Sequence, residues 1–236
     1  MYISTDAFIL KNIPYKETSI ISRVFSKETG KISIIFKGAK RQKNNISGSI
    51  EPGNLINITF LNKPNLKVSR EIKLIKAYYN SRKYLTNFYY NMAIISLIDK
   101  LCMENQHYSN LYNIIIEIFD YMDQKKMNIE ILFIYFLIQL NKNIGYEINF
   151  DNAFTGSSNN SISSEDIELI KILNQDIASL QKLDNKMIGK IDLINSLKIV
   201  IYKHMKHNVI DLNDIYAINM LKSMNDERTS RTDQAI

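Results

Sequence analysis

The residues best suited to chemistry form the basic run Lys37-Gly-Ala-Lys-Arg-Gln-Lys43, which carries four cations within seven residues. The run follows residues 31–36, whose alternating apolar side chains predict a β-strand. Gly38 allows the backbone to turn sharply at this point. Four neighbouring cations repel one another unless a polyanion comes close, and nucleic acid is the obvious polyanion. The alternative is an ordinary solvated basic loop.

The positive charge of the chain is concentrated in its first third. The protein has 236 residues and a formal net charge of +6. Residues 1–80 contain 14 lysines and arginines against 5 acidic residues, whereas residues 81–236 contain 16 against 19. A basic segment of this size attracts phosphate, and its affinity should fall with salt because binding releases counterions. The charge pattern therefore predicts that the first third binds nucleic acid.

Other kinds of active site find little support. Cys102 is the only cysteine, which excludes an intramolecular disulfide and a cysteine-rich zinc site. His204 and His207 have a spacing that metal ligands can adopt, but no third ligand lies at a recognisable spacing. Glycine-rich phosphate-binding motifs are missing, and no acidic pair has a nuclease-like pattern. We therefore expect no metal ion, no cofactor and no enzymatic activity.

The first 80 residues have the pattern of a small β-barrel. Alternating apolar residues and turn signals predict five strands, at residues 2–10, 19–25, 31–37, 55–61 and 66–78. Closing five strands into a barrel removes exposed edges, and the OB-fold is the five-stranded barrel that commonly binds single-stranded nucleic acid. Most aromatic residues of this part should fill the interior, and base stacking is the minority interpretation for each of Tyr2, Phe8, Phe25, Phe36 and Phe60.

From about residue 81 the apolar period becomes helical. Six helices are predicted, at residues 84–104, 108–122, 128–144, 165–174, 188–205 and 212–224. The expected fold class is α+β, with a five-stranded OB-fold barrel at residues 1–80 followed by an all-helical domain at residues 81–236. A polar insertion at residues 149–164 is either a surface loop or the remnant of an inserted module. Residues 225–236 are polar and expected to fray.

A series of short signatures runs along roughly the first 150 residues. They are Ala7-Phe-Ile-Leu10, Tyr15-Lys-Glu-Thr18, Val24-Phe-Ser26 with Glu28-Thr-Gly-Lys31, Lys37-Gly-Ala-Lys-Arg41, Glu51-Pro52, Phe136-Leu-Ile-Gln-Leu140 and Gly145-Tyr146. Their order resembles the RecO family of bacterial recombination mediators. Many members of that family follow the Gly-Tyr element with four zinc-binding cysteines. Here Asp151 and Asn152 stand where the first cysteine would lie, so the zinc module is degenerate or absent.

The resemblance implies a non-catalytic role in DNA repair and recombination. RecO-like proteins bind single- and double-stranded DNA and anneal complementary strands. In the RecFOR pathway they work with RecR, engage the C-terminal tail of single-stranded-DNA-binding protein (SSB) and help load RecA on SSB-coated DNA. A bacterial, cytoplasmic and nucleoid-associated location without a membrane partner is implied as well. The longest apolar stretches, such as residues 129–140, are too short to span a bilayer.

The family motif also assigns candidate DNA contacts. Matched residue by residue, the motif implies Lys37, Gly38, Lys40 and Arg41. Charge alone adds Lys43 and the strand cations Lys31, Lys67 and Arg70, although each strand cation could simply solvate its face. 

Two alternatives remain open at this point. The chain could be an RNA-binding OB-fold protein, which competition between single-stranded DNA and RNA would reveal. It could also be an accessory factor of a nucleic-acid-processing enzyme, such as a nuclease or ligase, with a cryptic metal site. Incubation of labelled DNA with magnesium or manganese would test that second alternative.

Overall fold

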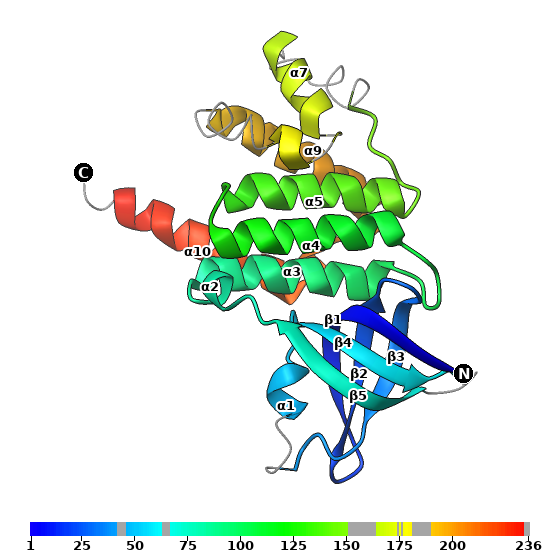
Figure 1. Ribbon diagram of the computed structural model, residues 1–236. Coiled ribbons are helices and arrows are strands. Elements are labelled where there is room, and N and C mark those ends of the chain that lie inside the picture. The colour runs from blue at the N-terminus through cyan, green and yellow to red at the C-terminus, as the bar shows by residue number, and fades with distance from the viewer. Residues whose placement is uncertain are drawn as a thin grey trace.

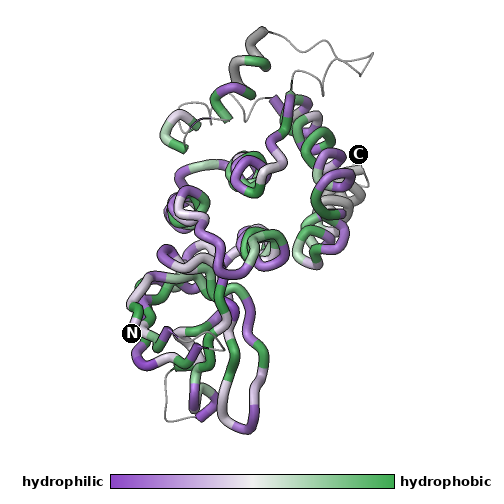
Figure 2. Tube along the Cα trace, turned by 90° about the vertical axis from the view of Figure 1, so that its right-hand side faces the viewer, coloured by the Kyte–Doolittle hydropathy of each residue, from purple (hydrophilic) through white to green (hydrophobic). Residues whose placement is uncertain are grey.

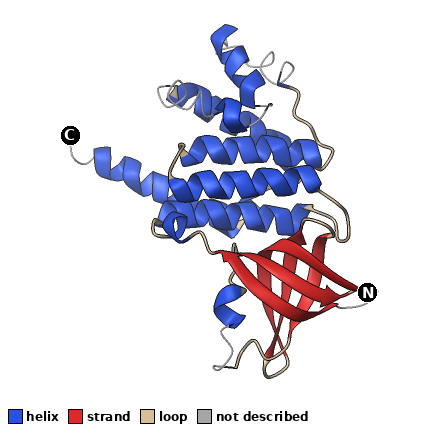
Figure 3. Ribbon diagram, viewed as in Figure 1, coloured by secondary structure: helices blue, strands red, loops and turns tan. Residues whose placement is uncertain are grey.

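A computed structural model of the protein describes residues 1–41, 46–62, 67–150, 164–173, 175, 177–180 and 190–233. A β-barrel forms one end of the molecule and helices are stacked above it (Figures 1 and 3). The strands are β1 (Tyr2–Tyr15), β2 (Ser19–Ser26), β3 (Gly30–Phe36), β4 (Leu55–Leu61) and β5 (Lys67–Lys76), with helix α1 (Ile46–Ser49) between β3 and β4. The helices that follow are α2 (Tyr79–Arg82), α3 (Leu85–Leu101), α4 (Ser109–Gln124), α5 (Ile129–Asn143), α7 (Ser164–Leu173), α9 (Ile191–Asn208) and α10 (Tyr216–Asp233), with the short 3-10 helix η1 (Leu212–Asp214) before the last. The α+β prediction is confirmed.

The five strands close into a barrel in the order β1-β2-β3-β5-β4. All neighbours are antiparallel except β3 and β5, which run parallel. This closed topology confirms the OB-fold prediction. β1 is longer than predicted and continues through Pro14 to Tyr15. The proline is tolerated because β1 pairs with β4 only through residues 2–8, which leaves one edge of its second half without a strand partner.

β1 is buried on both of its faces where it passes between the barrel interior and the helices. Ala7 and Ile9 point into the barrel core, while Phe8 and Leu10 belong to the core shared with the helices. Period-2 alternation therefore continues through residues 7–10 although all four side chains are buried. The burial of both faces explains why this segment reads as a continuous apolar run.

An aromatic cluster joins the barrel to the helices. The ring of Phe8 lies 6.1 Å from Tyr78, 6.0 Å from Tyr112 and 5.1 Å from Phe119, measured between centroids. Phe25 lies 6.1 Å from the same Tyr112 ring. The barrel and the helices thus share one continuous core. The change from strand to helix nevertheless falls near residue 80, where the division was predicted. The division into domains at residues 1–80 and 81–236 stays a prediction.

The positions of these aromatic rings decide their role. Phe8, Phe25, Phe36 and Phe60 are fully buried, either against the helices or inside the barrel. Their rings are therefore structural, as the majority interpretation predicted. Tyr2 differs, because 51% of it is exposed.

The helices build outward from the barrel in layers (Figure 1). α3 packs on β1 and β2 and also contacts α10, while α5 lies between α4 and α9. Asn128 caps α5 by accepting hydrogen bonds from the backbone amides of Glu130 and Ile131. The expectation that the end of the chain frays was wrong for residues 225–233, which belong to α10. Most of the predicted polar insertion, residues 151–163, lies outside the described residues. Across the described helices, none is both long and apolar enough to cross a membrane.

Candidate nucleic-acid interface

The barrel has two ends with different surroundings. We call the end that packs on the helices the near end and the opposite end the far end. At the near end, the turn between β2 and β3 meets the segment after α3, where the amide of Asn105 donates to the carbonyl of Lys31 over 2.9 Å. At the far end, the β1–β2 turn and the chain leaving β3 point away from the helices (Figure 1). In Figure 2 the tip of the hairpin furthest from the helices is hydrophilic. Consecutive antiparallel strands place the β1–β2 turn and the exit of β3 at the same end.

The predicted basic run begins at the far end as a tight turn. Gly38 has a φ of +70°, a left-handed conformation that favours glycine. The amide of Arg41 donates to the carbonyl of Gly38 over 3.0 Å and closes the turn. Ala39 is fully buried in the barrel core and anchors the turn between its exposed cations. The run is therefore an ordered part of the barrel through Arg41.

The basic turn is fastened to the β1–β2 turn. The amide of Lys40 donates to the carbonyl of Thr18 over 3.0 Å, and the Lys40 Nζ donates to the carbonyl of Lys16 over 3.1 Å. Lys16 itself has a φ of +51°. Its ammonium lies 5.4 Å from the centroid of the Tyr15 ring. These contacts bring a fifth cation, from a different turn, to the predicted site.

A surface pocket of about 510 Å³ lies between the two turns, with Lys16, Lys37 and Arg41 among its lining residues. None of the described residues that line it is acidic, although Glu17 is exposed nearby in the β1–β2 turn. Among the residues that the structure describes, these three cations form no ion pair with a carboxylate. A concave surface lined by one sign of charge concentrates its field. The pocket is therefore suited to an anion.

At the near end, the cations bind a residue of helix α3. The Arg23 Nη2 donates to Asp99 Oδ2 of α3 over 2.5 Å, and the Lys31 Nζ donates to the Asp99 carbonyl over 2.8 Å. Lys31 is only 8% exposed. Burial raises the pKa of Asp99 above its ordinary value, even though Arg23 and Lys31 act in the opposite direction. Lys31 joins the barrel to a helix and does not reach the far-end pocket, so we leave it out of the DNA-contact set.

The structure treats the remaining predicted contacts differently from one another. Lys67 opens β5 and pairs with Ile34, one residue before the pocket-lining Val68. Arg70 is exposed, and its guanidinium carbon lies 5.7 Å from the centroid of the Tyr2 ring. Lys43 lies outside the described residues. Of the sequence-predicted contacts, the structure therefore brings Lys37, Gly38 and Arg41 into one pocket and places Lys40 beside it.

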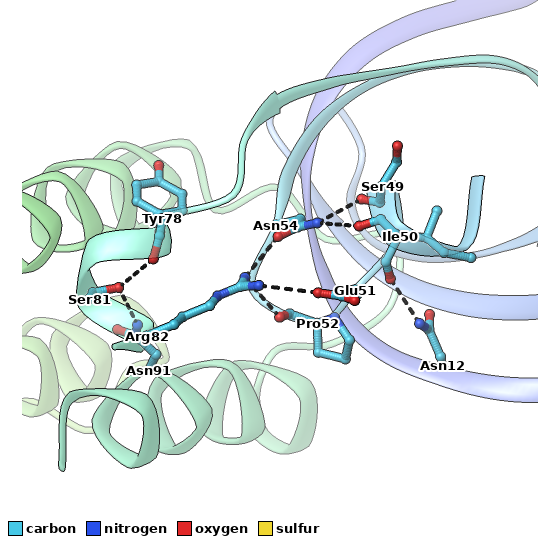
Figure 4. Close-up of polar contacts among 11 residues, drawn as sticks. Asn12, Ser49, Ile50, Glu51, Pro52, Asn54, Tyr78, Ser81, Arg82 and Asn91 are labelled. Atoms are coloured by element: carbon cyan, nitrogen blue, oxygen red, sulfur yellow. Dashed lines mark hydrogen bonds and ion pairs between the residues drawn. The ribbon is translucent and has the colours of Figure 1, made fainter. Parts of the chain in front are cut away.

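The connection between β3 and β4 begins with the basic turn. Its other end, just before β4, is anchored by Arg82 (Figure 4). The guanidinium of Arg82 donates to the carbonyl of Pro52 over 3.1 Å and to Asn54 Oδ1 over 2.8 Å. It also lies 3.5 Å from the Glu51 carboxylate. Burial lowers the pKa of Arg82, whose side chain is 16% exposed. The Glu51-Pro52 signature therefore marks a contact between barrel and helices.

Asn54, which accepts from Arg82, also contacts the end of α1. Its Nδ2 donates to the carbonyls of Gly48 and Ser49, over 2.9 and 3.0 Å, and so satisfies the end of the short helix. Asn12 of β1 donates to the carbonyl of Ile50 over 2.8 Å. We call residues 46–54 the strap. The strap is held by side chains from the barrel and from α2 at once.

Sequence reasoning missed part of the pocket, namely Tyr15, Lys16, Thr18, Ser19, Ile35 and Val68. One usable signal was present for Lys16. In a meander of three antiparallel strands, the first turn and the exit of the third strand share an end, so the cation in Tyr15-Lys-Glu-Thr18 had to lie near the basic run. The outer-face residues Ile35 and Val68 carried no such signal, because their juxtaposition depends on the parallel β3–β5 pairing.

The described residues contain no group of three or more histidine, cysteine or acidic side chains arranged to hold a metal ion. His204 instead lies with its Nε2 2.9 Å from the Tyr146 carbonyl. Cys102 is buried. 

Comparisons with known proteins cover most of the chain. Residues 1–78 match the family described as "Recombination protein O N terminal", and residues 82–185 match "Recombination protein O C terminal". The DNA repair protein RecO of Alkaliphilus metalliredigens is 24% identical over 223 residues, which cover 89% of this chain and 91% of the relative. The DNA repair protein RecO of Thermoanaerobacter sp. is 29% identical over 151 residues, covering 64% and 61% respectively. For that of Syntrophomonas wolfei the values are 24% identity over 153 residues, with 65% and 61% covered. The matched segment thus spans about three fifths of the length of the last two relatives.

Proposed function

The chain belongs to the recombination protein O (RecO) family of DNA repair proteins, and from this premise we propose that it is a non-catalytic DNA-binding mediator. In this proposal the far end of the barrel holds the sugar–phosphate backbone of single- and double-stranded DNA. The protein anneals complementary strands and helps load RecA on SSB-coated DNA in the RecFOR pathway.

The observation that carries the proposal is the uncompensated pocket at the far end. Lys16, Lys37 and Arg41 line one concave surface, and its other described lining residues include no carboxylate. Phosphate groups gain from such a surface because each one that is neutralised releases counterions. Contacts of this kind hold the backbone and do not read the base sequence. The proposed binding is therefore electrostatic and independent of sequence.

Strand annealing follows from the same electrostatics. Two complementary strands repel each other through their phosphates, and a cationic surface that holds one strand lowers this repulsion for the second. Because backbone contacts leave base edges open, the held strand can still pair. The helical part, residues 81–236, would supply the surfaces for RecR and for the C-terminal tail of SSB, through which RecA is reached indirectly.

The proposal is tested with two sets of barrel variants. The far-end set is Lys16→Ala, Lys37→Ala and Arg41→Ala combined, and the control combines Lys27→Ala with Lys73→Ala, two exposed barrel cations outside the pocket. Annealing of complementary oligonucleotides, followed by fluorescence, should slow by at least about tenfold for the far-end set and little for the control. Equal annealing rates for wild type and far-end set would refute the proposed site.

The same preparation distinguishes the alternatives. Tighter binding of single-stranded RNA than of DNA of the same sequence would support an RNA-binding protein instead. Cleavage of labelled DNA in the presence of magnesium or manganese would contradict the non-catalytic role.

A further inference from the structure

The far-end pocket has an apolar floor that phosphate binding does not use. Ile35 of β3 and Val68 of β5 are register partners in the parallel pair, and both line the pocket. Ile34 and Phe36, the β3 neighbours of Ile35, point into the barrel core instead. Ile35 and Val68 therefore lie on the outer side of the barrel, half buried, where the barrel core does not need them.

The other parts of the pocket complement this floor. The ring of Tyr15 is half buried and lines the pocket beside the Lys16 ammonium, which lies 5.4 Å from the ring centroid. Lys37 and Arg41 add two further cations. A volume of about 510 Å³ falls within the range of roughly 300–1,000 Å³ that is usual for small-molecule sites. A chain of phosphates alone does not need an apolar floor.

One ligand unit combines the groups that these surfaces prefer. A nucleotide carries an anionic phosphate next to a flat base, and bases gain affinity by stacking on aromatic and apolar surfaces. We propose that the pocket takes a single nucleotide of a single strand, with its base against Ile35, Val68 and Tyr15 and its phosphate among Lys16, Lys37 and Arg41. This inference rests on the proposed function, because the strand must reach the far end before one of its bases can enter.

The inference makes the pocket selective for unpaired DNA. In a duplex the bases are stacked and paired, so a base would have to leave the helix at a cost before entering. The cations act on both forms of DNA, whereas the apolar floor acts only on a strand with an accessible base. Single-stranded binding should therefore depend on Ile35 and Val68, and double-stranded binding should not.

The experiment uses the full chain with Ile35→Ser and Val68→Ser as separate variants, so that failure of one to fold does not end the test. Ile75→Ser serves as the control, because Ile75 lies on β5, is 45% exposed and does not line the pocket. Fluorescence anisotropy measures the Kd for a single strand, for a duplex and for a strand of abasic sites, and thermal unfolding checks each variant. We expect each pocket variant to bind the single strand about tenfold more weakly, and the control to match wild type.

Comparing intact and abasic strands, in wild type and in Val68→Ser, tests whether the base contacts the pocket floor. Wild-type protein should bind the abasic strand more weakly than the intact one, and Val68→Ser should weaken abasic binding no further. Duplex affinity should be the same for wild type and both pocket variants. Wild-type affinity of both serine variants for the single strand would overturn the inference. If the cation variants still lost affinity in that case, the proposed function would survive; if they did not, both would fail.

Discussion

At the near end of the barrel Arg23 and Lys31 both reach Asp99, whereas at the far end Lys16, Lys37 and Arg41 surround a pocket whose described lining contains no carboxylate. All five residues belong to the same basic barrel and are lysines or arginines. Their surroundings separate them, because the Asp99 carboxylate pairs with Arg23 and the Asp99 carbonyl accepts from Lys31, whereas no described carboxylate pairs with the far-end cations. The excess of positive charge in residues 1–80 thus overstates the number of cations available to DNA.

The aromatic residues divide in the same way. Phe8 and Phe25 lie at the near end in contact with Tyr112, and Tyr15 lies at the far end beside Lys16. Near-end rings exclude water between barrel and helices, while the far-end ring stays accessible. The comparison supports the proposal that the near end stabilises the fold while the far end binds DNA. 

Replacing Phe8 by alanine should break the near end most strongly. Phe8 is fully buried, and loss of a buried phenylalanine costs about 3–5 kcal/mol in the free energy of unfolding. Urea denaturation followed by circular dichroism measures the change. Tyr2→Ala is the control, because Tyr2 is 51% exposed and its loss should cost less than about 1 kcal/mol. Equal losses for the two variants would contradict the shared aromatic core.

Replacing Arg82 by alanine should have the next largest effect. The change leaves the Pro52 carbonyl and the Asn54 amide oxygen without their donor, at a cost of about 2 kcal/mol in the free energy of unfolding. Arg82→Lys keeps the charge but cannot form both bonds of the guanidinium fork, so it should recover only part of the loss. Urea denaturation of both variants provides the measurement. Full recovery by lysine would show that charge alone, rather than the fork, holds the strap.

The Arg23–Asp99 pair should have a smaller coupling energy. The side chains are 29% and 10% exposed, so we expect about 1–2 kcal/mol, above the usual value for surface pairs and below that for a fully buried pair. A double-mutant cycle with Arg23→Gln and Asp99→Asn measures it. A coupling energy near zero would show that the near-end cations are as uncommitted as those of the far end.

The pH dependence of the same pair has a defined sign. Because burial raises the pKa of Asp99 in the folded state above 3.8, the folded protein holds the proton more tightly than the unfolded chain does. The contribution of Asp99 to stability should therefore fall as the pH rises from 3.8 through the folded pKa. Denaturation across acidic pH should show this fall in wild type and not in Asp99→Asn. A rise in the Asp99 contribution over that interval would contradict the assignment.

Local patterns predicted the barrel, the helices and the basic turn, because each depends on residues close in sequence. β4 was predicted with its observed limits, since its apolar alternation is regular and turn-favouring residues flank it in the sequence. The roles of Arg23 and Lys31 could not be predicted, because Asp99 lies 76 and 68 positions away and becomes their partner only in the folded molecule. The pocket floor escaped prediction for the same reason, since Ile35 and Val68 meet through a parallel pairing that no local signal specifies.

The salt dependence of single-stranded DNA affinity tests the contrast between the two ends most directly. It is measured for wild type, for the far-end set Lys16→Ala, Lys37→Ala and Arg41→Ala, and for Lys31→Met at the near end. Lost phosphate contacts flatten the slope of log Kd against log salt by about 0.7 each, so the far-end set should lose roughly 2 from the slope. Lys31→Met should lower the melting temperature and keep the wild-type slope. A wild-type slope for the far-end set, or a flattened slope for Lys31→Met, would contradict the assignment of DNA binding to the far end.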